Sequence, residues 1–368
     1  MTGLHRGFAL ESIYWVLTWA CHRKCVHCYD DRFRPYVRDE LKAVIGEGQA
    51  AWPLILANLP ERFAYTDPKN ANRQKIGRII LAGGEVLHKP VREALFYPVL
   101  EALQKRYTPD DVKVSIQTTG DILTPKMIGE MLDRGVHMIA ISGMDEYHVG
   151  MEGDKRLPLM AKIRAMMAKA GVIEVSLGGK TSDGQRVDYT QEAGPYFLFF
   201  GAQPASWIGE IWPRGRAWTN NLADGDITTN FCARQSGGKN FLNHTKAGSE
   251  VAIEPSGDVY PCCIKTKTPI GNLTREPLIA MLDDLAAEPA LQALNAGDPA
   301  SMGVGDGWSS EQFLERSVTQ KPDGSSYANL CIGCDAFFEA KLGAVLRARA
   351  KARQTPLTKV DCLQTLSY

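Results

Sequence analysis

The sequence has no long apolar run and no excess of charge of one sign. No apolar stretch approaches the ~18 residues that a membrane-spanning helix needs. The opening residues MTGLHRGFALES lack the apolar segment of a secretory signal. Lysine and arginine together number 42, as do aspartate and glutamate. We therefore expect a cytoplasmic protein, and the charge balance predicts neither a nucleic-acid nor a membrane partner.

Cysteine is scarce and unevenly placed. The chain of 368 residues has nine cysteines, and none lies between Cys28 and Cys232. Cytoplasmic thiols stay reduced, so cysteines there are more often metal ligands than disulfide partners. A chain of this length usually forms two domains, and the gap between the cysteine groups predicts domains at 1–225 and 226–368. The stretch 297–327, rich in Gly, Ser and Asp, is expected to be irregular loop.

Short apolar runs alternate with helical patterns in the N-terminal half. This alternation predicts an α/β fold with parallel strands and helical crossovers, either a barrel or an open sheet. Pro98 predicts a kink or a split in the first of the expected helices. The expected strands are 13–19, 78–82, 112–117, 137–142, 173–178 and 207–212, and the expected helices are 89–106, 124–134 and 157–170.

Thiols and polar residues follow the first four predicted strands at the point where each strand ends. In parallel α/β sheets the chemistry takes place at the carboxyl ends of the strands, which share one edge. Features from four strands are therefore expected to meet at a single rim. They are Cys21, Cys25 and Cys28, then Gly83-Gly84-Glu85, then Thr118-Thr119-Gly120, and then Ser142.

The three cysteines follow the pattern C-x3-C-x2-C, which leaves a metal site one ligand short. Two cysteines make a disulfide, and four complete a zinc or iron–sulfur site. One interpretation is a tetrahedral zinc site that His22 or His27 completes. The other is a [4Fe–4S] cluster on three thiolates, with one iron free for a further ligand. Both interpretations are open at the level of the residues.

The motif Cys21-x3-Cys25-x2-Cys28, placed directly after a first strand, resembles the signature of the radical SAM superfamily. The resemblance implies a partial (β/α)6 TIM-like barrel and a cluster whose open iron chelates S-adenosylmethionine. It further implies reductive cleavage of S-adenosylmethionine to a 5′-deoxyadenosyl radical, which abstracts hydrogen from an unactivated C–H bond of the substrate.

The stretch LAGGEV at 81–86 resembles the second element of that family, a Gly-Gly-Glu that contacts the methionine moiety. Gly83 and Gly84 allow the backbone to approach a ligand, and the carboxylate of Glu85 would offset an ammonium group. A Gly-Gly pair is otherwise most often a simple turn. Weaker matches imply further contacts to S-adenosylmethionine, although polar strand ends and turn arginines are ordinarily surface features. These residues are Gln117, Thr118, Thr119, Ser142 and Arg216.

The second cysteine group resembles the C-terminal extension called SPASM, or its shorter twitch form. The match consists of a hairpin turning at 255–258, the spacing Gly257-x4-Cys262, and Ile270-Gly271-Asn272 before a helix. The resemblance implies a smaller α+β domain in which four thiolates hold one auxiliary [4Fe–4S] cluster. A zinc ribbon is the alternative. The implied ligands are Cys232, Cys262, Cys331 and Cys334.

Two cysteines are left without a metal. Spacing favours Cys262 over its neighbour Cys263 as the ligand. Cys263 and Cys362 are most simply free thiols. Either of them would serve as a radical quencher if its thiol faced the substrate.

The segment SGMDEYHVG at 142–150 supplies candidates for proton transfer. A carboxylate or an imidazole there would accept the proton that is lost when a substrate radical is oxidised. A solvated loop of charges is the alternative. The candidate residues are Asp145, Glu146 and His148.

The resemblance names no substrate. The short stretch before Cys21 has no room for a cobalamin domain or a leader-peptide domain, so we slightly favour a small-molecule substrate. A peptide or protein side chain is the alternative, and a metal-binding scaffold without catalysis is a remoter one. The chemistry would need an electron donor such as flavodoxin or ferredoxin.

Overall fold

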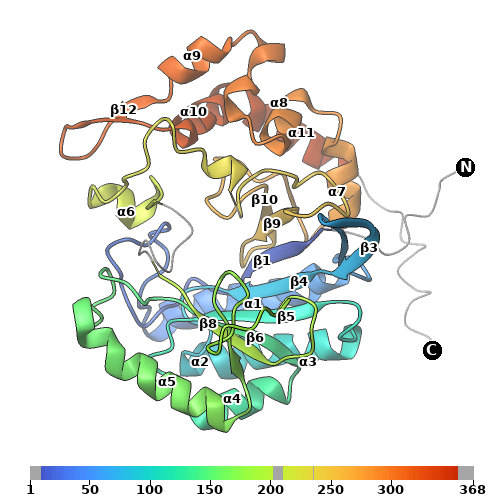
Figure 1. Cartoon of the computed structure of the whole chain (residues 1–368). Helices are drawn as coiled ribbons and strands as arrows, with labels where there is room; N and C mark the ends of the chain where they lie inside the picture. The colour runs from blue at the N-terminus through green and yellow to red at the C-terminus, as the bar shows by residue number, and fades with distance from the viewer. Residues whose placement is uncertain (1–9, 202–209, 235, 355–368) are drawn as a thin grey trace, which may run out of the picture.

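One large sheet runs through the molecule. The structure, a computed structural model, describes residues 10–201, 210–234 and 236–354. In this part of the chain the sheet has nine strands in the order β11-β10-β9-β1-β4-β5-β6-β8-β7 (Figure 1). Every pairing from β1 to β7 along this order is parallel. The parallel strands are β1 (Ser12–Val16), β4 (Arg78–Ala82), β5 (Lys113–Thr118), β6 (Val136–Ile141), β8 (Tyr196–Phe199) and β7 (Ile173–Glu174).

Strand β1 separates the two faces of the sheet. Successive side chains of a strand point to opposite faces. Ile13 and Trp15 are buried in the core that also contains Ile55 of helix α1. Tyr14, between them, points the other way and lines two cavities. One face of the sheet is therefore packed against helices, and the other is available for a site.

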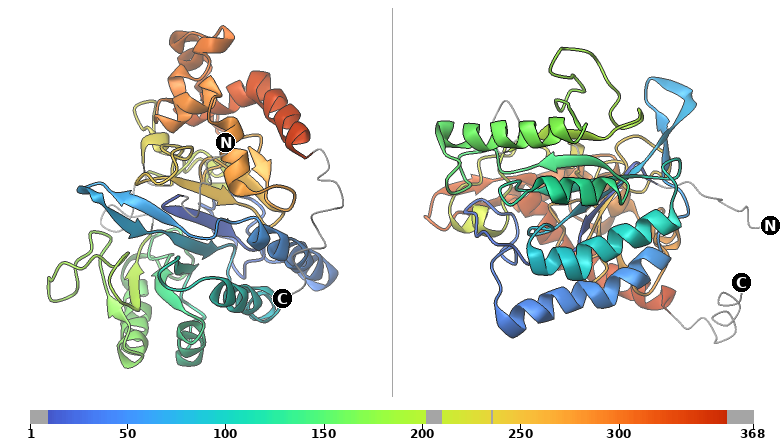
Figure 2. Two further views of the ribbon diagram at one scale, coloured as in Figure 1. Left: turned by 90° about the vertical axis from the view of Figure 1, so that its right-hand side faces the viewer. Right: turned by 90° about the horizontal axis from the view of Figure 1, so that it is seen from below.

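Helices cover the packed face in succession (Figure 2). They are α1 (Arg38–Ala57), α3 (Tyr97–Arg106), α4 (Pro125–Leu132) and α5 (Leu157–Lys169). The predicted helices at 124–134 and 157–170 are confirmed, and the side chain of Thr124 accepts a hydrogen bond from Met127 N as an N-cap. Helix α1 was not predicted, because Gly46, Gly48 and Pro53 weaken its helical signal.

Pro98 splits its helix, as predicted. The segment consists of α2 (Lys89–Val91), a π-helical turn η1 (Arg92–Phe96) and α3. Proline has no N–H to donate to the carbonyl four residues earlier, that of Ala94. The side chain of Gln49 donates to this carbonyl instead, at 2.9 Å.

The far edge of the sheet differs from the prediction. The strand expected at 173–178 leaves the sheet after Glu174, since Val175 bridges to Thr181 in a local excursion. The strand expected at 207–212 is not present in its described residues, 210–212. Strand β8, from the aromatic run YFLF, lies instead between β6 and β7. The rest of the predicted strand, 207–209, lies outside the described residues.

The sequence did not reveal a separate two-stranded hairpin. It consists of β2 (Ala64–Asp67) and β3 (Asn70–Ile76). The side chains of β3 are mostly exposed and polar, which hides its strand pattern, whereas those of β2 are mostly buried. Lys75 Nζ lies 2.6 Å from Asp188 Oδ2, and Ile76 N donates to Gln191 Oε1 at 2.8 Å. The hairpin is thereby fastened to the segment before β8.

The C-terminal part extends the same sheet. Strand β9 (Glu250–Ile253) pairs with β1 in parallel and forms the predicted hairpin with β10 (Asp258–Tyr260). Strand β11 (Gly271–Asn272) completes this edge. The boundary predicted at residue 225 is crossed by a continuous sheet. The helices that follow are α7 (Leu278–Leu285), α8 (Pro289–Asn295), α10 (Leu330–Phe337) and α11 (Gly343–Arg353).

The prediction of irregular loop at 297–327 is wrong. Helix α9 (Ser310–Glu315) begins in this stretch with a capping box between Ser309 and Gln312. The hairpin of β12 (Val318–Gln320) and β13 (Ser326–Ala328) follows. The Gly- and Ser-rich composition obscured both elements. None of the helices in the described ranges combines the length and the apolar character that a bilayer span requires.

Candidate active site

The three N-terminal cysteines lie on a loop that leaves β1 at the carboxyl edge of the sheet. Cys21 and Cys25 are buried and Cys28 is half-buried. All three line a cavity of about 210 Å³. Its other walls come from the ends of the neighbouring strands, as the sequence predicted. The predicted residues among these walls are Gly83, Gly84, Gln117, Thr119, Ser142, Asp145 and His148.

Arg216 holds the cysteine loop in place. It is the second residue of the short helix α6 (Gly215–Thr219) and is buried. Its guanidinium donates to three carbonyls of the loop, those of Cys25 at 2.8 Å, Asp31 at 3.0 Å and Phe33 at 2.6 Å. Contact of Arg216 with S-adenosylmethionine stays a prediction, and Arg216 does not line the cavity. Arg216 is therefore a positioning residue for the loop.

The charge of Arg216 also favours the thiolate form of Cys28, whereas burial raises the pKa of Cys21. A hydrogen bond from Cys25 and then the nearby guanidinium lower the pKa of the Cys28 thiol to about 7, although burial opposes the shift. A thiolate, not a thiol, is the form that ligates a metal.

Asp121 is a residue that sequence reasoning missed. Its carboxylate lies 2.8 Å from His22 Nε2 and accepts from Arg23 Nε at 2.9 Å. These bonds join the cysteine loop to the end of β5. Burial would raise the pKa of Asp121, but the hydrogen bonds from His22, Thr119 and Arg23 outweigh it and lower the pKa. The signal was available, since Asp121 directly follows the predicted strand-end stretch Thr118-Thr119-Gly120.

Glu85 lies behind the wall of the cavity. Its carboxylate is 1 % exposed and accepts from the hydroxyls of Thr118 and Thr119, each at 2.8 Å. It also accepts from the backbone N–H groups of Thr119 and Leu87. Glu85 and Thr118 thus tie the end of β4 to that of β5. Contact of either side chain with a ligand stays a prediction, and neither lines the cavity.

Gly84 is required by the close approach of the cysteine loop. A Cβ atom there would lie 2.3 Å from Ala20 O and 2.8 Å from Cys21 Cβ. Gly84 N donates to Thr18 O and Glu85 N to Ala20 O, both at 2.9 Å. The backbone of the Gly-Gly-Glu stretch therefore positions the first cysteine.

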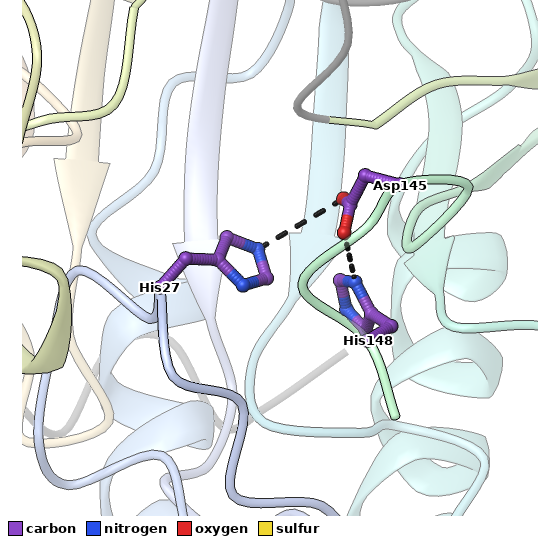
Figure 3. Close-up of side chains that lie close together, drawn as sticks. All are labelled: His27, Asp145 and His148. Carbon is purple, nitrogen blue, oxygen red and sulfur yellow. Dashed lines mark hydrogen bonds and ion pairs between the residues drawn. The ribbon is translucent and has the colours of Figure 1, made fainter. Parts of the chain in front are cut away.

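Two histidines and a carboxylate form a cluster between the cysteine loop, which carries His27, and the segment after β6, which carries Asp145 and His148 (Figure 3). His148 Nδ1 lies 2.7 Å from Asp145 Oδ1, and His27 Nε2 lies 4.0 Å from Asp145 Oδ2. Burial, and then the charge of His148, lower the pKa of His27 to about 4. Glu146, predicted with this group, is exposed, and its carboxylate bonds to Gly153 N and Arg156 outside the cavity.

The two histidines beside the three thiols direct their Nε2 atoms away from them. In the described part of the chain, two triads have all their ligand atoms within 4.8 Å, and neither contains a thiol. His22 and His27 belong to these triads and turn their Nε2 atoms toward carboxylates. The Nε2 atoms of both histidines are thus engaged away from the thiols, whereas the Nδ1 atoms of both have no hydrogen-bond partner among the described residues.

The cavity also contains a polar atom without a hydrogen-bond partner. His27 Nδ1 is buried and has no partner among the described residues, and His27 lines the cavity. Buried polar groups in proteins are normally satisfied, so this atom indicates a site for a polar ligand beside the cysteines.

A second cavity of about 300 Å³ occupies the interior of the curved sheet below the first. We call this second cavity the lower cavity, and the cavity of the N-terminal cysteines the upper cavity. The two cavities share four lining residues, Tyr14, Gln117, Phe200 and Ser236. Tyr14 OH donates to Gln117 Oε1 at 3.0 Å. Polar side chains of the strands, including Arg78, Lys113 and Ser115, line the lower cavity. Together the cavities offer space for two ligands side by side.

The other predicted cysteine ligands converge at a separate small cavity. Cys232, Cys262, Cys331 and Cys334 line it and are each at most 9 % exposed. Cys331 and Cys334 come from the start of α10, and Cys262 follows β10. Burial raises the pKa of Cys262 to about 11 and that of Cys331 to about 12, and Arg214 opposes both shifts. Four thiolates buried here need a compensating cationic group, which an iron–sulfur cluster provides.

Cys263 does not belong to this second set. It is 5 % exposed and lines the first cavity, beside the three N-terminal cysteines. The preference for Cys262 as the ligand therefore agrees with the geometry. Cys362 lies outside the described residues.

The C-terminal part matches a known domain family. Residues 246–335 match the family model of SPASM, an iron–sulfur cluster-binding domain. The matched segment contains three of the four converging cysteines, and Cys232 lies upstream of it. The chain therefore carries a SPASM iron–sulfur cluster-binding domain. No curated protein sequence matches the chain.

Solved structures with a similar course of the chain include BtrN in complex with AdoMet and 2-DOIA. The identity is 14% and the TM-score 0.41, with 79% of this chain and 89% of BtrN covered. For anSMEcpe with bound AdoMet the identity is 14% and the TM-score 0.38, with 92% of this chain and 99% of anSMEcpe covered. For Streptococcus suis SuiB bound to S-adenosylmethionine the identity is 11% and the TM-score 0.37, with 78% of this chain and 68% of SuiB covered. The function has to be argued from the geometry of the site.

Proposed function

We propose that the chain is a radical SAM enzyme that acts on a small molecule. In this proposal Cys21, Cys25 and Cys28 hold a [4Fe–4S] cluster, and S-adenosylmethionine binds beside it in the upper cavity. When bound, this pair supplies a 5′-deoxyadenosyl radical that removes hydrogen from an unactivated C–H bond.

One observation carries the proposal. Three thiols of a single loop line a cavity at the carboxyl ends of parallel strands, and this loop, in the pattern C-x3-C-x2-C, supplies no fourth thiol. A scaffold site would be closed by a fourth ligand, whereas a site that binds and activates a molecule keeps one position open. The incomplete ligand set therefore supports catalysis over a structural role.

In this proposal the side chains around the thiols bind S-adenosylmethionine and hold the cysteine loop in place. Gln117, Thr119 and Ser142 present hydrogen-bonding groups to the upper cavity, where they would fix the polar parts of S-adenosylmethionine. Arg216 and Asp121 hold the cysteine loop against the strand ends. The loop and the hydrogen bonds behind it thus fix the reacting groups before the substrate enters.

Asp145 and His148 are proposed to accept the substrate proton. Asp145 bonds to His148 Nδ1, which fixes the orientation of the ring. Both residues are buried and line the upper cavity. The pair would take up a proton when a substrate radical is oxidised.

The lower cavity supports a small molecule as the substrate. Its volume of about 300 Å³ is at the lower end of the range of small-molecule sites, about 300–1,000 Å³. Ser115, Gln117 and Lys113 offer polar contacts within it. A peptide side chain that enters from the rim is the alternative, which makes the protein a peptide maturase.

The second set of thiols is proposed to hold one auxiliary [4Fe–4S] cluster. Its ligands would be Cys232, Cys262, Cys331 and Cys334. This cluster would exchange an electron with the substrate radical or help to bind the substrate, and a flavodoxin or ferredoxin would be the electron donor. Zinc in place of this cluster is the alternative to test.

The proposal is tested by anaerobic reconstitution. The protein is loaded with iron and sulfide, and the metal content is measured before dithionite and S-adenosylmethionine are added. We expect about eight irons per chain from two clusters, together with 5′-deoxyadenosine as a product. Replacement of Cys21, Cys25 and Cys28 by Ala should abolish 5′-deoxyadenosine and leave about four irons.

The matched variant carries Cys232→Ala, Cys331→Ala and Cys334→Ala. It should lose the auxiliary cluster and retain cleavage of S-adenosylmethionine. Zinc in place of iron, with no 5′-deoxyadenosine, would contradict the proposed function.

A further inference from the structure

The lower cavity has a basic floor, the end at which Arg78 and Lys113 lie. These two are the first residues of β4 and β5 and are partners in the sheet, and both line the cavity. The lining residues that the structure describes include no Asp or Glu. His137 also lines the cavity, and burial lowers its pKa, which favours its neutral form. The charged groups that face the cavity are therefore both positive.

Both cations keep hydrogen-bond donors free for a ligand. The ammonium group of Lys113 has no ion pair or hydrogen bond with any described residue. The guanidinium of Arg78 has one ion pair, in which Nη1 lies 3.3 Å from Glu11 Oε1. A guanidinium carries five N–H donors and an ammonium three. Donors remain on each side chain, and carboxylates and phosphates are the groups that such donors bind best.

The nearest carboxylates lie behind the floor and not in the cavity. Glu11 also accepts from Gly248 N at 2.6 Å, and Glu250 accepts from the hydroxyl of Ser12. Neither carboxylate lines the cavity. They offset part of the positive charge of the floor. This favours a ligand group with one negative charge, a carboxylate, over a phosphate group with a charge of about −1.5 to −2.

The walls above the floor are largely apolar. Ile80, Leu198 and Phe200 line them. Along β5, Lys113 and Gln117 point to the same face, and their Cα atoms are about 13 Å apart for four residues of strand. Gln117 also lines the upper cavity. A molecule that fills this length has one end at the floor and the other where the two cavities meet.

We propose that the lower cavity binds a substrate with a carboxylate at one end and a mainly apolar body, and that Arg78 and Lys113 bind the carboxylate. The inference rests on the proposed function and names the class of its substrate. The far end of the substrate lies beside Tyr14 and Gln117, which line both cavities. Hydrogen is therefore removed from a carbon remote from the carboxylate.

The experiment measures binding of three probes to the reconstituted protein by anaerobic titration calorimetry, without S-adenosylmethionine. The probes are 3-phenylpropanoate, its neutral amide 3-phenylpropanamide, and 2-phenylethyl phosphate. Hydrogen bonds to charged groups are the stronger ones, so we expect the carboxylate to bind about tenfold or more tightly than the amide. The phosphate should bind more weakly than the carboxylate.

Lys113→Met carries the test, because Lys113 has no ion pair among the described residues and its loss should leave the fold intact. The variant should bind the carboxylate and the amide alike, whereas Lys113→Arg should retain the preference. Lys126→Met is the matched control, since Lys126 lies on α4 with its side chain mostly in water. The control should bind all three probes like the unmodified protein, and each variant should keep its full iron content.

The outcomes separate the two proposals. Equal affinity for acid and amide, no binding of either, or a preference that survives Lys113→Met would overturn the anion site. Tighter binding of the phosphate would overturn the assignment of a carboxylate. Production of 5′-deoxyadenosine is measured separately. A protein that prefers the carboxylate but forms no 5′-deoxyadenosine refutes the proposed function and leaves the anion site standing.

Discussion

At the scale of single residues, the side chains behind the cysteines hold the cysteine loop in place. The guanidinium of Arg216 donates to three carbonyls of the cysteine loop, and the carboxylate of Glu85 accepts hydrogen bonds at the end of β5. Buried donors and acceptors that lose their partners cost about 1–3 kcal/mol each. The loop is therefore rigid because its backbone is bonded from several sides.

Gly84→Ala should empty the N-terminal cluster site. The added methyl group would lie 2.3 Å from Ala20 O, so the cysteine loop has to move. We expect iron to fall from about eight to about four per chain, with loss of 5′-deoxyadenosine. Iron analysis and optical spectra of the reconstituted variant measure the effect.

Gly129→Ala is the matched control for that change. Position 129 lies inside α4, and a Cβ atom there meets nothing within 4 Å. Alanine in a helix interior is about 0.5–1 kcal/mol more favourable than glycine, so this variant should be slightly more stable and bind full iron. Full iron in Gly84→Ala would contradict the role assigned to Gly84.

The cysteines could be predicted from sequence and their supports could not. Cys21, Cys25 and Cys28 lie close together in the chain, so their spacing can be recognised from the sequence alone. Arg216 and Asp121 contact the loop across long sequence separations, and no local pattern reports such contacts. Glu146 was predicted together with Asp145 because the two are adjacent in the chain. Neighbours in a loop need not face the same way, however, and only Asp145 faces the cavity.

At the scale of elements, the segment between β7 and β8 closes the lower cavity. Tyr189 and Thr190 line that cavity, and His137 of β6 binds this segment through Nε2 and Tyr189 O at 2.8 Å. Burial and then the charge of Lys113 lower the pKa of His137, although its backbone hydrogen bond opposes the shift. The fold thus favours the neutral imidazole.

His137→Gln should make the free energy of unfolding depend less on pH below about pH 6.5. The unfolded chain protonates this histidine near pH 6.5, whereas the folded chain resists protonation until a lower pH. The stabilisation is therefore present above pH 6.5 and lost as the pH falls from about 6.5 toward the lowered pKa of the folded state. Anaerobic urea unfolding between about pH 8 and pH 5 measures the slope.

Glutamine keeps a donor for Tyr189 O and does not titrate. The variant and the unmodified protein should therefore differ little at pH 8 and more at pH 5. An identical slope for both proteins would show that His137 titrates alike in the folded and unfolded chains.

At the scale of the whole molecule, a partly buried ion network joins the two cysteine-bearing loops. Lys265, three residues after Cys262, places Nζ 2.7 Å from Asp30 Oδ2 and 2.9 Å from Glu254 Oε1. Arg32 bonds to the same two carboxylates. Asp30 belongs to the N-terminal cysteine loop, and Glu254 directly follows β9. The network fixes how the two proposed cluster sites lie relative to each other.

Lys265→Met should loosen this connection. The change leaves two buried carboxylates with Arg32 as their remaining cation, and breaking a buried pair costs up to about 3–5 kcal/mol. We expect a lower free energy of unfolding and reduced iron at both sites. Denaturant unfolding and iron analysis under anaerobic conditions measure the two effects.

Lys42→Met is the control for loss of a lysine charge. Lys42 pairs with Asp39 on an exposed face of α1, with both side chains mostly in water. Such pairs contribute about 0–1 kcal/mol, so the control should be nearly neutral. Equal stability of the two variants would exclude the network as a structural connection.

The sequence by itself determined the chemistry of each segment. Apolar runs specified the strands β1, β4, β5 and β6, and close spacing specified the cysteine loop, because strands, turns and ligand loops depend on residues that are near one another in the chain. The same local logic located the hairpin and the thiols of the SPASM domain.

Only the tertiary structure decided which of these pieces meet. It placed β8 inside the sheet, turned Arg216 onto the cysteine loop, and divided Cys262 and Cys263 between two cavities. The reason is physical, since the order of strands and the direction of a buried side chain depend on contacts between distant segments. Those contacts exist only once the sheet has formed.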